Sequence, residues 1–239
     1  KIMFQGSVSQ ANFLGSGNTV GAAFNTGKIN QNIGLNYTNP YYNVDGLSRG
    51  FEVHKRRTNA AALNLGDYST HSIGGGVNFG YPLSEQDAIF FGFNGDRTTL
   101  NLGANSPPRL KTFVGQFGSS YVAITGTIGW ARDSRDSAIW TTSGLTQRAN
   151  LELTPAGDLN YYRASYDTSW YTSFTRDLTM MLRGEVAVAD GLGGKPLPFF
   201  KNYYGGGIGS VRGYRTGSLG PRDPFDDSSI GGNRRVSGS

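Results

Sequence analysis

The residues best placed to do chemistry in this chain are carboxylates and arginines that recur along three segments between positions 145 and 188. They are Arg148, Glu152, Arg163, Asp167, Arg183 and Glu185. An acid beside a cation can take part in proton transfer, because the neighbouring charge shifts its pKa. The same residues can instead form charge pairs between neighbouring strands inside a hydrated barrel. We favour lumen charges over proton chemistry.

Other reactive residue types are sparse. The chain has no cysteine, which excludes disulfides and cysteine-based zinc sites, and its two histidines, His54 and His71, fit no metal-binding spacing. The glycine-rich stretch 205–209 is not followed by the Lys-Ser/Thr of a phosphate loop. We therefore expect no enzymatic activity, no metal and no cofactor.

The elements that position these residues follow a period of two, which is typical of β-strands. Apolar side chains occupy one phase and small or polar side chains the other, as in Ile73, Val77 and Phe79 against Gly74 and Gly76. The clearest segments are 29–38, 71–81, 121–131, 145–154, 161–170 and 178–188. The pattern predicts about ten strands, the first at 1–14 and the last full one at 178–188.

Composition distinguishes two all-β folds, a soluble sandwich and an outer-membrane barrel. Charged residues are only 16% of the 239, whereas 36 glycines, 13 tyrosines and 14 phenylalanines suit a barrel with a small-residue interior and aromatic girdles. The longest apolar run, 88–93, is too short for a spanning helix. We expect an antiparallel transmembrane β-barrel.

Connections of two lengths join the expected strands. Tight turns are predicted at 14–18, 43–46, 84–87 and 174–177, and longer loops at 59–70, 103–120 and 191–232. Short turns on one rim and long loops on the other are the arrangement of outer-membrane barrels. The chain begins inside a strand-like segment without a signal peptide and ends as another strand begins, so we expect an internal piece of a longer protein.

The net charge of +5 is not concentrated in one surface. The single basic run is Lys55-Arg56-Arg57. We interpret this triplet as a strand end or loop rather than a nucleic-acid-binding surface.

The most distinctive block lies in the last predicted loop. It contains Val211-Arg212-Gly213-Tyr214, preceded by an aromatic and glycine-rich stretch and followed by Leu219-Gly220-Pro221-Arg222. The residues that we expect to support this loop are Phe199, Phe200, Tyr203, Tyr204, Gly205, Gly206, Gly220 and Pro221.

These motifs, in this order, make the chain resemble the β-barrel of the BamA family of outer-membrane protein assembly factors. That family carries Val-Arg-Gly-Phe/Tyr in its sixth external loop, between Pro-Phe-Phe-x-Asn-Phe/Tyr-Tyr-x-Gly-Gly and Leu-Gly-Pro-Arg/Lys. Further similar segments are Ser9–Gly17, Thr38–Gly46 and Asp190–Gly194. The resemblance covers essentially the whole chain.

The resemblance implies part of a sixteen-stranded barrel that normally follows periplasmic POTRA domains. Residues 1–190 would form strands and hairpins, 191–232 the long external loop folding into the lumen, and 233–239 the start of the next strand. The POTRA domains, the first strand and roughly the last five strands of the family are not in this sequence.

The function implied by the resemblance is the core insertase that folds outer-membrane proteins into the Gram-negative outer membrane. Its partners would be unfolded outer-membrane proteins, accessory outer-membrane lipoproteins and outer-membrane lipid, with no nucleic acid. Arg212 would anchor the loop in the lumen, while Val211, Gly213 and Tyr214 shape its tip. Two alternatives stay open: a two-partner secretion transporter of one exoprotein and, less favoured, a passive porin.

Overall fold

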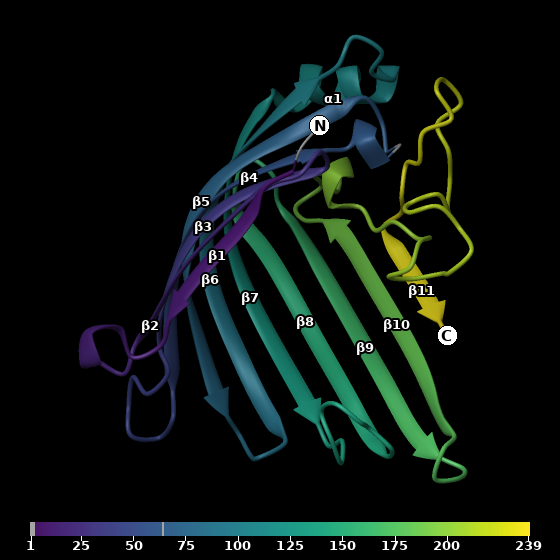
Figure 1. The fold of residues 1–239 in the computed structure, drawn as a ribbon. Coiled ribbons are helices and arrows are strands. Elements are labelled where there is room, and N and C mark those ends of the chain that lie inside the picture. The colour runs from purple at the N-terminus through teal and green to yellow at the C-terminus, as the bar shows by residue number, and fades with distance from the viewer. Residues whose placement is uncertain (1–2, 64) are drawn as a thin grey trace.

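The computed structural model describes residues 3–63 and 65–239, which form one antiparallel sheet whose strands pair in sequence order (Figure 1). The eleven strands are β1 (Gln5–Gln10), β2 (Thr19–Thr26), β3 (Asn30–Asn39), β4 (Ser48–Asn59), β5 (Tyr68–Pro82), β6 (Asp87–Leu102), β7 (Ser120–Asp133), β8 (Gly144–Gly157), β9 (Tyr161–Ser173), β10 (Thr179–Gly191) and β11 (Arg234–Gly238). The helical segments are α1 (Pro108–Phe117) and three short 3₁₀ turns, η1 (Phe13–Gly15), η2 (Ala61–Leu63) and η3 (Phe199–Lys201). The predicted all-β antiparallel fold is confirmed.

The sheet curls into a trough with two different ends (Figure 1). The loop end carries α1 and the long connection between β10 and β11, which we call the long loop (residues 192–233). The turn end carries tighter connections, such as those at 83–86 and 174–178. No helix among the described residues is long and apolar enough to cross a membrane.

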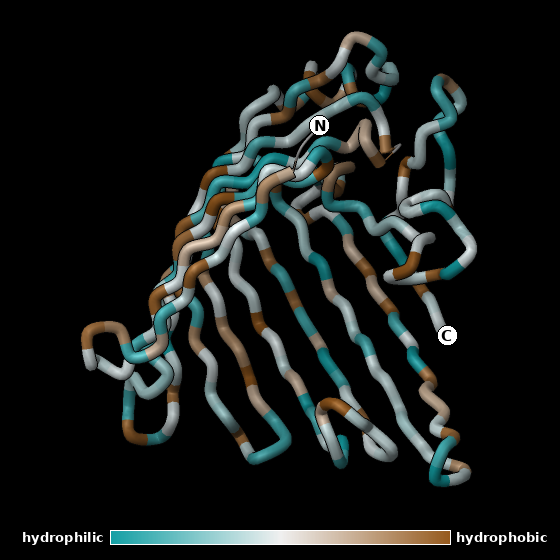
Figure 2. Tube along the Cα trace, viewed as in Figure 1, coloured by the Kyte–Doolittle hydropathy of each residue, from teal (hydrophilic) through white to brown (hydrophobic). Residues whose placement is uncertain are grey.

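Hydrophobic and hydrophilic residues alternate along several strands (Figure 2), and successive side chains of a strand point to opposite faces of the sheet. Ile33, Ile73 and Phe93 on the convex phase are 57–62% exposed. Side chains of the opposite phase line a cavity of about 520 Å³ on the concave side. An exposed apolar face opposite a polar interior is the pattern of a membrane barrel wall and the reverse of a soluble sandwich.

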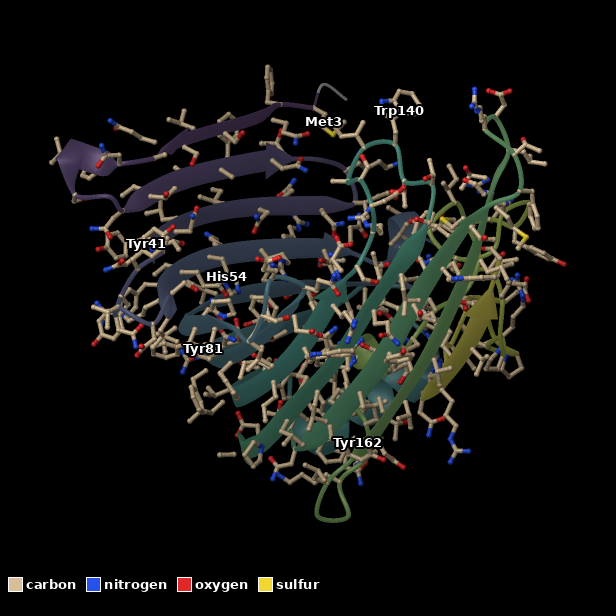
Figure 3. All side chains as sticks on the ribbon, turned by 90° about the horizontal axis from the view of Figure 1, so that it is seen from below. Met3, Tyr41, His54, Tyr81, Trp140 and Tyr162 are labelled. Carbon is tan, nitrogen blue, oxygen red and sulfur yellow. The ribbon has the colours of Figure 1, made fainter. Side chains whose placement is uncertain are left out.

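Glycines on the concave face of β5 leave room for side chains of the flanking strands β4 and β6 to meet over that face. His54 on β4, Gly74 on β5 and Asp96 on β6 lie in one register row. His54 Nε2 is 3.0 Å from Asp96 Oδ1, and a Cβ atom at Gly74 would collide with the Asp96 carboxylate. The small residues of this phase therefore make room for polar contacts in the interior, where His54 is labelled in Figure 3.

Several predicted boundaries are wrong, each for a local reason. The first strand ends at Gln10 rather than at 14, because Asn12 and Leu14 adopt left-handed backbone conformations; residues 1–2 of that prediction lie outside the described part of the chain. The predicted loop 103–120 contains α1, which starts with Pro108 as its first helical residue. The predicted loop 59–70 overlaps the start of β5 at Tyr68.

The densest packing lies at the loop end. Buried residues from the strands, from α1 and from the long loop form one cluster there, with Leu110 of α1 fully buried. Its ring-bearing members are Tyr68, Phe113, Phe117, Tyr121, Phe199 and Phe200, and we call them the aromatic cluster. The cluster joins the long loop to the wall.

Candidate functional site: the long loop on the concave wall

The first part of the long loop, residues 198–204, is the loop base and packs against the wall. Phe199 in η3 is 9% exposed, and its ring contacts Tyr68 and Phe113 edge to face at centroid distances of 5.0 and 5.2 Å. Edge-to-face geometry is favoured by the ring quadrupoles and adds to the free energy of apolar burial. Phe199 therefore stabilises the seating of the loop between β5 and α1.

The loop base also forms an ion pair with the wall, through Lys201 and Glu152. Lys201 Nζ lies 3.1 Å from Glu152 Oε1 on β8, and Arg163 Nη1 on β9 lies 3.3 Å from the other carboxylate oxygen. Tyr161 donates its hydroxyl to Glu152 at 2.7 Å. Burial alone would lower the pKa of Lys201, but the charge and hydrogen-bond interactions with Glu152 and Tyr161 together outweigh burial and leave that pKa raised. Lys201 therefore stays protonated at neutral pH.

Tyr203 completes the loop base between two arginines. Its ring lies under Arg163 at 4.7 Å and Arg235 at 5.6 Å, and its hydroxyl donates to the Ala164 carbonyl at 3.3 Å. A cation over a ring face is attracted by the ring's negative quadrupole. Arg235 also donates to the Tyr204 carbonyl at 3.0 Å and pairs with Glu185. The base is thus tied to β8, β9 and β11, and Arg235 links β11 in turn to β10.

The part that carries the distinctive motif, residues 207–215, is the loop tip, and its residues 212–215 are exposed. Its turn is closed by hydrogen bonds from Gly207 N to Val211 O and from Ser210 N to Gly207 O, both 3.1 Å. Arg212 is exposed, and no ion pair or side-chain hydrogen bond reaches it among the described residues. The role of Arg212 as a lumen anchor therefore stays a prediction.

The other predicted loop residues shape the backbone around the tip. Gly213 and Gly220 have φ values of +88° and +114°, which favour glycine. Gly205 pairs with Leu219 and precedes Gly206, whose φ is +103°. Tyr214 is 56% exposed, and the Pro221 carbonyl accepts a hydrogen bond from Ile230 N at 3.0 Å.

A second arm of the long loop, residues 222–229, reaches the helix α1. Asp223 on this arm is buried and forms an ion pair with Arg109 of α1. Burial would raise the pKa of Asp223, but hydrogen bonds from Phe225 N and Arg109 prevail and hold it below its usual value. The arm is thus linked to α1 as an ionised carboxylate.

The structure brings together some of the predicted lumen charges. Glu152 and Arg163 form an ion pair across β8 and β9, whereas Glu185 pairs with Arg235 on β11. Arg148 and Asp167 face each other in register, and Arg183 lies opposite a serine; no ion pair involves these three within the described chain.

Sequence reasoning missed Lys201, Tyr161, Arg235 and the Arg109–Asp223 pair. Lys201 could have been noticed because it is the variable residue x of the Pro-Phe-Phe-x-Asn block. Tyr161 could have been placed on the inner face because it shares the strand phase of Arg163. Nothing in the sequence pairs Arg109 with Asp223, because the two residues are 114 positions apart.

The contacts of this site hold the long loop in position. Among the residues that the structure describes, no three histidine or acidic side chains converge as metal ligands. The charged groups of the loop base are engaged with one another, which fixes a loop rather than exposing a reactive atom. The site is a seated loop beside a polar cavity.

Comparisons with known proteins agree with this geometry. Residues 12–239 match the Omp85 superfamily domain. The chain is 34% identical over 98% of its length to the outer membrane protein assembly factor BamA of Neisseria meningitidis, and 28% identical over 96% to that of Nitratidesulfovibrio vulgaris. It spans 31% and 28% of those two proteins.

A solved structure gives the same result. The crystal structure of BamA from Haemophilus ducreyi lacking POTRA domains 1–3 superposes with a TM-score of 0.90 at 25% identity. The match covers 99% of this chain and 49% of that one. The open sheet therefore corresponds to part of a barrel wall.

Proposed function

The chain belongs to the Omp85 superfamily, and we propose that it forms part of the barrel of an outer-membrane protein assembly factor. In this proposal the whole protein folds and inserts other β-barrel proteins into the Gram-negative outer membrane. The observation that carries it is similarity to proteins named as assembly factors over 96–98% of this chain.

The proposed mechanism uses geometry and needs no cofactor. A client strand gains backbone hydrogen bonds by pairing with an exposed strand edge, which is β-augmentation. A weakly paired seam and a locally thinned bilayer would lower the barrier to insertion of client hairpins. The convex apolar face of β3–β10 would contact lipid, and the long loop, held by its base, would act as the control element inside the barrel.

The partners that we propose are unfolded outer-membrane proteins, accessory outer-membrane lipoproteins and outer-membrane lipid. Arg212, Val211, Gly213 and Tyr214 would act at the loop tip. Because Arg212 is free of charge partners within the described chain, its proposed partners belong to barrel strands outside this sequence.

The proposal is tested with the full-length protein in lipid vesicles. Urea-denatured outer-membrane barrels of different sizes are added, and folding is followed by the gel shift that separates folded from heat-denatured barrels. We expect faster folding of several unrelated clients than in protein-free vesicles.

A different result identifies the alternative. Transport of a single exoprotein without faster folding of any barrel would replace the proposal with a two-partner secretion transporter. Passage of small solutes alone would indicate a porin. The similar proteins named as assembly factors favour the first outcome.

A further inference from the structure

The basic run Lys55-Arg56-Arg57 is divided by the alternation of β4. Arg56 lines the polar cavity with His54 and Glu52, so it faces the concave side. Lys55 and Arg57 have the opposite phase, which is that of exposed Phe51 and Val53 on the convex face. Two of the three cations therefore face the lipid side of the wall.

A third cation joins them from a neighbouring strand. Arg97 on β6 is exposed and lies in one register row with Lys55 and Ile73. Arg57 lies in the next row, opposite His71 on β5. Strands are about 4.8 Å apart, so the backbones at Lys55 and Arg97 are roughly 10 Å apart, within reach of two long side chains.

These cations have no partner in the described part of the chain. Neither an ion pair nor a side-chain hydrogen bond involves Lys55, Arg57 or Arg97 there. The carboxylates nearest in the register, Glu52 and Asp96, belong to the concave phase. Among the described residues, the positive charges of this convex patch are thus not paired with carboxylates.

Its position along the strands is that of a membrane boundary. From the patch toward the turn end, the convex rows become apolar: the next row contains Val53, and the row after it contains Phe51, Val77 and Phe93. The basic patch therefore lies between these apolar rows and the loop end. Another arginine of this face, Arg49 on β4, lies near the turn end, with its guanidinium 3.8 Å from the Tyr42 ring. Charges on a barrel's lipid face cost least at such interfaces.

We propose that Lys55, Arg57 and Arg97 form a binding site for the phosphate groups of a lipid in the external leaflet. Arginine and lysine pair strongly with phosphate oxygens, and the adjoining apolar rows receive acyl chains. Three cations on two strands fit a lipid with more than one phosphate. This inference rests on the proposed function, with the loop end facing outward as expected for the long external loop.

The test measures lipid binding by the full-length protein in micelles of a neutral detergent. The probe is lipid A carrying two phosphates, and bound lipid is counted by native mass spectrometry. The variant K55Q/R57Q/R97Q removes the patch, while Arg49→Gln removes another convex arginine, near the turn end, and serves as a matched control.

We expect the triple variant to bind this lipid at least about tenfold more weakly, since each cation near a charged lipid surface contributes to the attraction. Arg49→Gln should bind like the wild type. Equal binding by the triple variant, or an equal loss in Arg49→Gln, would overturn the site. Full displacement of lipid A by excess inorganic phosphate would assign the patch to free phosphate and overturn a lipid site.

Failure of the proposed function can be separated from failure of this inference. Client folding by the triple variant in vesicles of neutral lipid should equal that of the wild type. If the wild type folds no client but its lipid A binding still depends on the three cations, the assembly function fails and the lipid site stands.

Discussion

The base and the tip of the long loop are held in opposite ways. The base buries Phe199 in the aromatic cluster and pairs Lys201 with Glu152 on β8. The tip carries the Val211–Tyr214 motif, and Arg212 there is exposed. Within this chain, the part of the loop that is most distinctive in sequence is therefore separate from the part that fixes it in space.

This difference predicts that substitutions at the base change the position of the loop, whereas substitutions at the tip change its proposed function. Apolar burial and coupled ion pairs give the base a defined position, whereas the tip keeps its charge available for a further partner. The following substitutions in the full-length protein test that separation.

Phe199→Ala should have the largest effect. Truncating a buried phenylalanine removes apolar contacts and leaves a cavity, at a cost of about 3 kcal/mol in the free energy of unfolding. Urea unfolding should shift to lower concentration, and protease should cut the loop base. Phe225→Ala is the control, because Phe225 is on the same loop but is 62% exposed. An uncut loop base in Phe199→Ala would show that the aromatic cluster does not seat the loop.

Glu152→Gln should have the next largest effect. The substitution leaves Lys201 and Arg163 facing each other without a carboxylate, and their partial exposure limits the cost to about 1–3 kcal/mol. The same unfolding and proteolysis measurements apply. Asp167→Asn is the matched control on β9, since Asp167 has no ion pair among the described residues. Equal losses in the two variants would mean that net lumen charge, rather than this contact, holds the base.

Asp223→Asn should loosen only the second arm, by about 1 kcal/mol. Because the folded-state pKa of Asp223 is lowered, its carboxylate stabilises the fold above the unfolded value near 3.9, and this contribution disappears as pH falls through the folded pKa. Proteolysis of residues 222–229 should increase at neutral pH in the variant and on acidification in the wild type. A wild-type arm equally protected at neutral and acidic pH would contradict the ion pair with Arg109.

Arg212→Ala should have the smallest effect on stability, within about 0.5 kcal/mol. We expect protease to cut the tip more readily and assembly of client barrels to fall, while the base stays protected. Normal client assembly together with an unchanged tip would remove Arg212 from the proposed function. Cleavage of the base in this variant would show that base and tip are not separate.

Much of the architecture could be predicted from sequence. Period-two alternation located most strands, because the side chains of a strand point to its two faces in turn. The helix α1 could not be predicted in this way, since its ten residues lie between Gly103 and Ser120 in a segment without alternation and depend on burial of Leu110 for their packing.

The fold class, the two phases of the clearest strands and the motif that indicates the family could all be derived from the amino-acid sequence. The folded chain was needed to show which phase is concave, that Glu152 pairs with Lys201, and that Glu185 pairs with Arg235 instead of Arg183. This is because alternation is a local property of the backbone. Contacts between residues about 50 positions apart depend on the register and curvature of the whole sheet.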